Sequence, residues 1–266
     1  MSTNAEDIGQ EPLLLREDVD SIATLTLNRP EKFNALSEDM LTALQEALDS
    51  LAEDETVNVV VLAAAGKAFC GGHDLKEMRS NPDVDYYKYL FNKCSDMMLS
   101  MTKIPQPVIA RVHGIATAAG CQLVATADLA IASSSATFAT SGVTLGLFCS
   151  TPGVALSRNV LRKHAMEMLL TGDFIPAGEA AQLGLVNRVV QPDRLDAEVY
   201  GLAAHIADRP AVAVRTGKQM FYEQIDKELE AAYRYAAEVM AQNMMAGDTA
   251  EGIDAFIEKR NPAWKR

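Results

Sequence analysis

The sequence predicts an α/β fold, because short apolar runs with β-like character alternate with helical stretches along its 266 residues. The β-like runs are residues 22–27, 57–63, 107–112 and 128–132. A chain of this length, with 48% hydrophobic and 23% charged residues, can bury one sizeable core. No linker or repeat divides the sequence, so we predict one core over residues 1–195 and a helical C-terminal region over residues 196–266.

The helical stretches each carry their own signal. Ser37 is a good N-cap, and the residues after it place apolar side chains three or four positions apart. Tyr, Phe and Met recur at helical spacing over residues 83–103, which predicts a helix that packs on the core rather than a cofactor site. Beyond residue 176 the strand signals reduce to one run at 186–190, and residues 192–259 are mostly helical.

Charge and cysteine usage exclude several classes of partner. A formal net charge of -12 disfavours nucleic acid and anionic membranes, because either requires a basic surface. No apolar run reaches the roughly 18 to 20 residues that a membrane-spanning helix needs. The four cysteines are widely spaced and form no Cys-x-x-Cys pair, and residues 1–10 lack the basic and apolar segments of a leader. We therefore expect a reduced, cytoplasmic protein without a metal site.

Two glycine-bearing turns carry the chemical signal, GKAFCGGHDLKEM (66–78) and HGIATAAGCQL (113–123), and each lies between an apolar strand and a helix. The small residues in them are Gly71, Gly72, Ala118, Ala119 and Gly120. Small residues let a ligand approach the backbone, and the first N–H groups of a helix have no internal acceptor. Two such N–H groups aimed at one point would polarise a carbonyl or stabilise an enolate. Neither turn matches a nucleotide-binding pattern.

Five segments in the same order resemble the crotonase superfamily, the enoyl-CoA hydratase/isomerase family. They are LNRPEKFNAL (27–36), AFCGGHDLKEM (68–78), HGIATAAGCQLVATADLAIAS (113–133), FATSGVTLGL (138–147) and LTGDFIPAGEAAQLGLVNRVV (170–190). The resemblance implies a crotonase-type spiral of ββα turns with a helical C-terminal trimerisation region, assembled as a homotrimer or a dimer of trimers. It also implies an acyl-CoA thioester as ligand, with coenzyme A as part of the substrate and no separate cofactor.

The resemblance further implies the positions of the site. The thioester carbonyl would bind between the backbone N–H groups of His73 and Ala119. The substrate and coenzyme A contacts would fall on Arg29, Lys32, Asn34, Ala35, Cys70, Gly71, Gly72, Asp74 and Gly120, with Lys259 or Lys265 added by a neighbouring subunit. Arg29 and Lys32 would offset phosphate charge on this acidic chain.

The two catalytic glutamates of the hydratases are missing. Their positions read Gln122 and Gly142, and a third family position, which carries an aspartate in dienoyl isomerases, reads Ser150. Hydration needs one group to activate water and one to protonate the α-carbon, each worth about 10²–10⁴-fold in rate. Glutamine and glycine cannot do this, so we expect hydratase activity to be weak or absent.

Few other polar side chains near these positions could perform the acid/base chemistry of the two glutamates. Asp128 fits a structural role at the start of its strand, and Asp74 fits a helix N-cap. Cys149 has no predicted base beside it, which argues against a nucleophilic role. The Gly-His-Asp run at His73 resembles the methylmalonyl-CoA decarboxylase branch, although the tyrosine of that branch falls on Cys149.

Three functions remain open from the sequence. The first is an acyl-CoA enzyme that stabilises a thioester enolate through its oxyanion hole. The second is an acyl-CoA decarboxylase assisted by His73, because loss of CO₂ generates an enolate without a base. The third is a non-catalytic acyl-CoA binder.

Overall fold

The computed structural model describes residues 11–264, and its centre is a six-stranded sheet in the order β1-β2-β3-β5-β7-β10. The strands are β1 (Leu14–Val19), β2 (Ile22–Leu27), β3 (Val59–Ala64), β5 (Val108–Val112), β7 (Leu129–Ser133) and β10 (Arg188–Val190). β1 and β2 pair antiparallel, and the other neighbours pair parallel. Every residue of β3 is buried, as expected for a parallel strand covered on both faces.

A second, smaller sheet has four strands in the order β4-β6-β8-β9. It contains β4 (Ala68–Cys70), β6 (Ile115–Thr117), β8 (Thr137–Ala139) and β9 (Ile175–Pro176). The chain therefore passes from the large sheet to the small one three times, in the pairs β3/β4, β5/β6 and β7/β8. This repeated path is the predicted spiral of strand pairs and helices, and the α/β class is confirmed.

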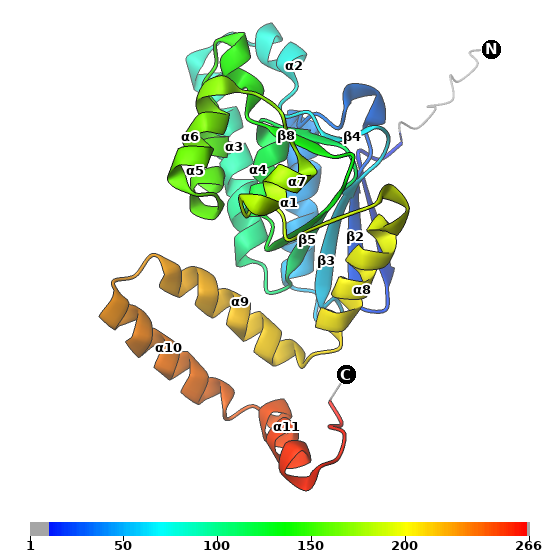
Figure 1. Ribbon diagram of the computed structural model, residues 1–266, viewed down its shortest axis with the longest axis vertical. Coiled ribbons are helices and arrows are strands. Elements are labelled where there is room, and N and C mark those ends of the chain that lie inside the picture. The colour runs from blue at the N-terminus through cyan, green and yellow to red at the C-terminus, as the bar shows by residue number, and fades with distance from the viewer. Residues whose placement is uncertain (1–10, 265–266) are drawn as a thin grey trace, which may run out of the picture.

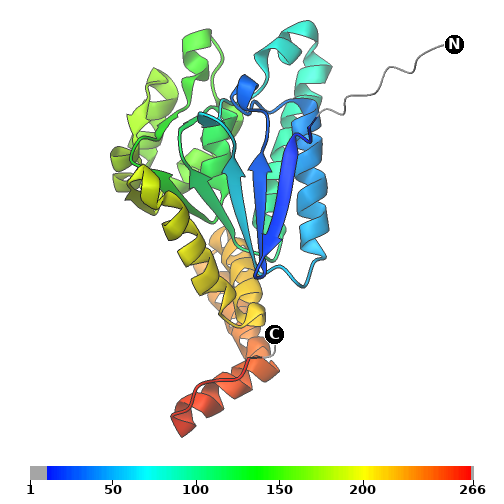
Figure 2. The same ribbon diagram turned by 90° about the vertical axis from the view of Figure 1, so that its right-hand side faces the viewer.

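Helices cover both faces of the large sheet (Figures 1 and 2). The core helices are α1 (Glu38–Ala52), α2 (Leu75–Ser80), α3 (Val84–Lys103), α4 (Ala119–Thr126), α5 (Ser150–Asn159), α6 (Arg162–Thr171), α7 (Ala177–Gln182) and α8 (Leu195–Ala207). α1 and α3 contribute to the main core on one face, and α8 packs on the other. The predicted start of α1 is confirmed, because the Ser37 side chain accepts a hydrogen bond from the N–H of Met40.

Short 3-10 helices connect these elements at η1 (Pro30–Lys32), η2 (Ser141–Leu145) and η3 (Pro192–Arg194). The predicted helical region after residue 196 has two parts: α8 packs on the sheet, and three further helices leave the core as an arm (Figure 2). These are α9 (Ala211–Ile225), α10 (Leu229–Asn243) and α11 (Gly247–Glu258). In residues 11–264, no helix has the length and apolar character needed to cross a membrane.

Candidate active site

The two glycine-bearing turns meet in the structure. Gly72 has a φ of +92°, and a Cβ added to it would lie 3.0 Å from Ala118 Cβ and 3.4 Å from the Ala119 nitrogen. A Cβ on Gly120 would overlap the carbonyl oxygen of Cys70. The turn that follows β4 therefore lies directly against the first turn of α4. The small residues therefore allow two backbone segments to pack closely against each other. The sequence did not reveal this role in packing.

Both expected N–H groups lie at this junction without an acceptor. Leu36 donates its N–H to the Gly72 oxygen at 2.8 Å, and Asp74 donates to the Leu36 oxygen at 3.3 Å. Because neighbouring backbone groups of an extended segment alternate in direction, the N–H of His73 points away from Leu36. Ala119 is the first residue of α4. Among the hydrogen bonds of residues 11–264, none uses the N–H of His73 or of Ala119.

Gln122 lies one helical turn beyond Ala119. Its side chain is buried, with 5% of its surface exposed, and no described residue provides a hydrogen bond to Oε1. Burial of a neutral amide at this point provides hydrogen-bonding capacity but no acid or base. The side chain therefore cannot supply the proton transfer that the resemblance assigns to a glutamate at this position.

Gly142 lies in η2, close to Cys149. The Gly142 N–H donates to Cys149 Sγ at 3.3 Å. A Cβ on Gly142 would lie 2.8 Å from that sulfur and would overlap the Leu147 carbonyl oxygen. The position where the resemblance predicts the second glutamate of the hydratases therefore has no space for a side chain. Burial raises the pKa of the Cys149 thiol, which also argues against a nucleophilic role for this cysteine.

The His73 imidazole is held against the core. Its Nδ1 lies 3.4 Å from the Leu36 carbonyl oxygen, and its ring meets the Phe91 ring edge-on with centroids 5.5 Å apart. Burial lowers the pKa of His73 below its ordinary value, which favours the neutral ring. The His73 ring is therefore neutral and contacts Leu36 through Nδ1. These features do not support a role for His73 in decarboxylation.

Asp74 and Arg29 bind each other. The Asp74 carboxylate accepts hydrogen bonds from the N–H groups of Lys76 and Glu77, which confirms its role as the N-cap of α2. Arg29 Nη1 lies 2.9 Å from Asp74 Oδ2. Burial raises the pKa of Asp74, but the Glu77 N–H and Arg29 outweigh this effect, so the net pKa is lowered. Arg29 and Asp74, both predicted to contact the ligand, thus form an ion pair with each other.

Asn34 is held by hydrogen bonds within the protein. It is fully buried and has a φ of +53°. Its Oδ1 accepts from the Arg29 N–H, and its Nδ2 donates to the carbonyl oxygens of Ala65 and Ala68. These three hydrogen bonds shape the loop, and the contact of Asn34 to coenzyme A stays a prediction.

The other expected contacts differ in their surroundings. Lys32 is exposed, Ala35 is partly buried, and Cys70 is fully buried. Burial raises the pKa of the Cys70 thiol to about 12. Lys259 ends α11, which lies at the opposite end of the molecule from α2 (Figure 1). Its predicted role as a contact from a neighbouring subunit stays a prediction, and Lys265 lies outside the described residues.

Asp128 has the structural role that the sequence predicts. Its carboxylate accepts hydrogen bonds from the Val108 N–H at 2.7 Å, Lys218 Nζ at 2.7 Å and Tyr222 Oη at 2.8 Å. Lys218 is nearly buried and also donates to the carbonyl oxygens of Met101 and Gln106. This cluster attaches α9 to the core. Sequence reasoning missed Lys218, because a lysine in a helical stretch ordinarily lies in solvent.

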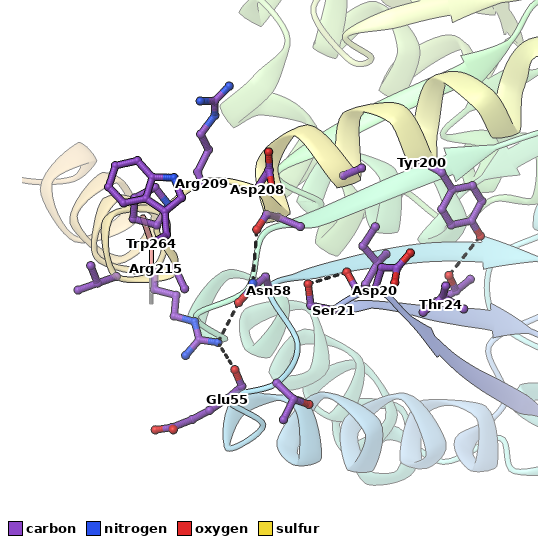
Figure 3. A pocket seen from close by; sticks show the side chains of 18 of the residues that line it. Asp20, Ser21, Thr24, Glu55, Asn58, Tyr200, Asp208, Arg209, Arg215 and Trp264 are labelled. Atoms are coloured by element: carbon purple, nitrogen blue, oxygen red, sulfur yellow. Dashed lines mark hydrogen bonds between the residues drawn. The ribbon is translucent and has the colours of Figure 1, made fainter. Parts of the chain in front are cut away.

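A large cavity lies elsewhere in the molecule. It has a volume of about 1440 Å³ and opens between the β1–β2 edge, α8, α9 and Trp264 (Figure 3). Arg215 crosses it and donates to the carbonyl oxygens of Glu55 and Val57. The cavity shares no residue with segments 66–78 and 113–123. The unbonded N–H groups therefore place the candidate active site at the two turns. In residues 11–264, no cluster of three or more His, Cys, Asp or Glu side chains is placed to hold a metal ion.

The chain is similar to several proteins over almost its whole length. It is 60% identical to an enoyl-CoA hydratase of Mycobacterium smegmatis of known structure, with a TM-score of 0.95 over 96% of this chain and 99% of that one. It is 43% identical to human enoyl Coenzyme A hydratase domain-containing protein 3, with a TM-score of 0.93 over 95% and 100% of the two chains. The mitochondrial enoyl-CoA hydratase domain-containing protein 3 of Xenopus laevis is 44% identical over 95% of this chain and 86% of its own.

These names correct one expectation. The relatives from Xenopus laevis, Mus musculus and Homo sapiens, at 44% to 45% identity, are named mitochondrial proteins, so the predicted cytoplasmic location is contradicted. The composition of residues 1–10 is too weak a basis for predicting a cytoplasmic location.

The family model for enoyl-CoA hydratase/isomerase matches residues 17–266. Together with the spiral of strand pairs and the solved relatives, this match shows that the chain belongs to the enoyl-CoA hydratase/isomerase family.

Proposed function

We propose that the protein binds an acyl-CoA thioester and holds the thioester carbonyl oxygen between the backbone N–H groups of His73 and Ala119. The observation that carries this proposal is that both N–H groups lie unbonded at one junction of two turns. Two fixed donors in a buried site stabilise negative charge on an oxygen far better than mobile water does. Coenzyme A enters as part of the substrate.

The chemistry that this site supports is stabilisation of a thioester enolate without strong acid or base assistance. The amide of Gln122 does not titrate, and Gly142 contributes only backbone. The nearby Asp74 caps α2 and pairs with Arg29, while Asp128 is bound to Lys218. We infer that hydration of an enoyl thioester is weak or absent for this reason.

The arm formed by α9, α10 and α11 supports a homotrimer or a dimer of trimers. Several large apolar side chains on it are exposed in the single chain: Phe221, Ile225, Leu229, Tyr233, Met240, Met244, Met245, Phe256 and Ile257. Exposed apolar area of this extent is typical of a subunit interface. Sedimentation should therefore show a trimer or hexamer, and a stable monomer at micromolar concentration would contradict this assembly.

The test of the site uses a chromophoric enoyl-CoA whose absorbance shifts to the red when its carbonyl is polarised. The wild-type protein should produce this shift. Ala119→Pro removes the backbone N–H at the first position of α4, so the shift should shrink or vanish in the folded variant. Val84→Pro is the matched control, because Val84 is the exposed first residue of α3.

The control should keep the full shift. Circular dichroism reports whether each variant folds. A wild-type complex without a red shift would refute the proposed carbonyl site. Binding and a red shift without any turnover on enoyl, malonyl-type and 3-hydroxyacyl thioesters would assign the protein to the non-catalytic binders.

A further inference from the structure

Two hydroxyl groups link the candidate active site to a separate part of the fold. Thr117 Oγ1 and Ser141 Oγ lie 2.7 Å apart, so one hydroxyl donates a hydrogen bond to the other. Thr117 ends β6, two residues before Ala119, and Ser141 begins η2. Both residues are partly buried. The contact therefore connects the turn that carries the Ala119 N–H to a loop 24 residues further along the chain.

The turn between β6 and α4 has an unfavourable backbone conformation. Ala118 has a φ of +52° and a ψ of −119°, a combination that glycine adopts readily and alanine adopts rarely. Conformations of this kind persist only where the surrounding structure holds them. Ala118 is also the N-cap of α4, and its methyl side chain cannot accept a hydrogen bond from the first turn of the helix. The geometry of this turn therefore depends on its neighbours.

The conformation of Ala118 sets the direction of the Ala119 N–H. That N–H belongs to the planar peptide group between the two residues, so rotation about the backbone bonds of Ala118 turns it. The Ala118 N–H donates to the Ala139 carbonyl oxygen at 3.0 Å, which fixes the strand side of the turn. Relaxation of Ala118 to a negative φ would turn the Ala119 N–H away from the junction with the other glycine-bearing turn.

The loop that carries Ser141 is a fixed support. Thr140, which precedes Ser141, is buried and donates its hydroxyl to the Met168 carbonyl oxygen in α6 at 2.8 Å. Gly142, which follows Ser141, donates its N–H to Cys149 Sγ. Both neighbours of Ser141 are thus bonded to other parts of the fold. Ser141 therefore presents its hydroxyl to the end of β6 from a fixed position.

We propose that Ser141, through its hydrogen bond to Thr117, is a positioning residue that keeps the Ala119 N–H directed at the thioester carbonyl. This inference rests on the proposed thioester site. Neither hydroxyl touches the ligand in this role. The pair holds the residue before Ala118 in place, and Ala118 then keeps the conformation that it would otherwise leave. Without the pair, the Ala119 N–H remains but loses its fixed direction, and a fixed donor polarises a carbonyl better than a mobile one.

The experiment records the red shift of the chromophoric enoyl-CoA at saturating protein, where a change in affinity alone does not alter the spectrum. Thr117→Val and Ser141→Ala each remove one hydroxyl, and each should shrink the shift in the folded protein. Losing one neutral hydrogen bond changes the equilibrium between the two turn conformations by about two- to ten-fold. The double variant should shrink the shift no further than either single variant, because both changes remove the same hydrogen bond.

Two control variants separate positioning from a general loss of structure. Thr117→Ser keeps the hydroxyl and should keep most of the red shift. Thr144→Val removes a different hydrogen bond of η2, from Thr144 Oγ1 to the Ser141 carbonyl oxygen at 2.7 Å, and should leave the red shift unchanged. Circular dichroism reports whether each variant folds.

The outcomes separate this inference from the function on which it rests. A full red shift in folded Thr117→Val and Ser141→Ala overturns the positioning role but leaves the thioester site intact. An equal loss in Thr144→Val, or a loss in Thr117→Ser as large as in Thr117→Val, does the same. A wild-type protein that binds the chromophore without a red shift overturns both. If Ser141→Ala does not fold, the comparison of Thr117→Val with Thr117→Ser decides.

Discussion

The Gly142 N–H donates to Cys149 Sγ at 3.3 Å, and this contact lies at the position where the resemblance of the sequence predicts a catalytic glutamate in the hydratases. The sulfur and the Leu147 carbonyl oxygen fill the space that a side chain would need. The obstacle is steric, since Gly142 is not among the glycines with a positive φ. The loop is therefore closed around Gly142.

We predict that Gly142→Ala destabilises the protein by about 1–3 kcal/mol, because the added methyl group forces the loop to move. Urea unfolding measures the loss. Gly201→Ala is the control: a Cβ there meets no atom within 4 Å, and the residue lies inside α8. Alanine is the better helix former, so the control should be neutral or more stable by up to about 1 kcal/mol. A Gly142→Ala protein as stable as the wild type would contradict the crowded loop.

Much of the fold was predictable, because its signals are local. The apolar runs predicted β2, β3, β5, β7 and β10, and Ser37 predicted the start of α1, but β1 and the short strands of the smaller sheet were missed. That Gln122 and Gly142 stand at the positions of the two hydratase glutamates stays a prediction of the resemblance. The contact between Gly72 and Ala118 was not predictable, since it joins residues distant in sequence through backbone shape. The same holds for the buried Lys218, whose environment is set by carbonyl groups that no sequence pattern marks.

We predict that Lys218→Met weakens the attachment of α9. The change leaves the Asp128 carboxylate without its cation, and losing one partner of a buried ion pair typically costs about 3–5 kcal/mol. Urea unfolding should show this loss, and sedimentation should show a larger fraction of monomer. Lys227→Met is the control, because Lys227 pairs with Glu223 on the surface of the same arm. Such an exposed pair contributes at most about 1 kcal/mol. Equal effects of the two changes would show that Lys218 is not an anchor.

The pH dependence of stability should report the buried histidines. Burial lowers the pKa of both His73 and His113 below the ordinary value of 6.5. On acidification, these histidines therefore take up protons at a higher pH in the unfolded chain than in the folded protein. The folded state is favoured fully above pH 6.5, and this contribution to stability is lost as the pH falls toward the folded pKa values. The melting temperature should drop below pH 6.5, and His73→Gln should flatten this drop. His205→Gln, at an exposed position, should leave it unchanged. A wild-type melting temperature that rises over this range would refute the burial of His73 as a neutral ring.

Hydration of crotonyl-CoA should be at least about 10⁴-fold slower than in a family member with both glutamates, since two acid/base groups are missing and their effects need not multiply fully. Gln122→Glu restores a carboxyl group at a buried position, where desolvation raises its pKa and lets it act as an acid. The gain should stay within about 10²-fold, because Gly142 cannot supply the second group. Adding Gly142→Glu should give no further gain, since the Leu147 carbonyl oxygen and Cys149 Sγ occupy its space. The loss of enoyl absorbance measures the rate, with Gln182→Glu as the control for an added surface charge. Rapid hydration by the wild-type protein would show that another group, such as His73 or a bound water, performs the proton transfer that Gln122 cannot.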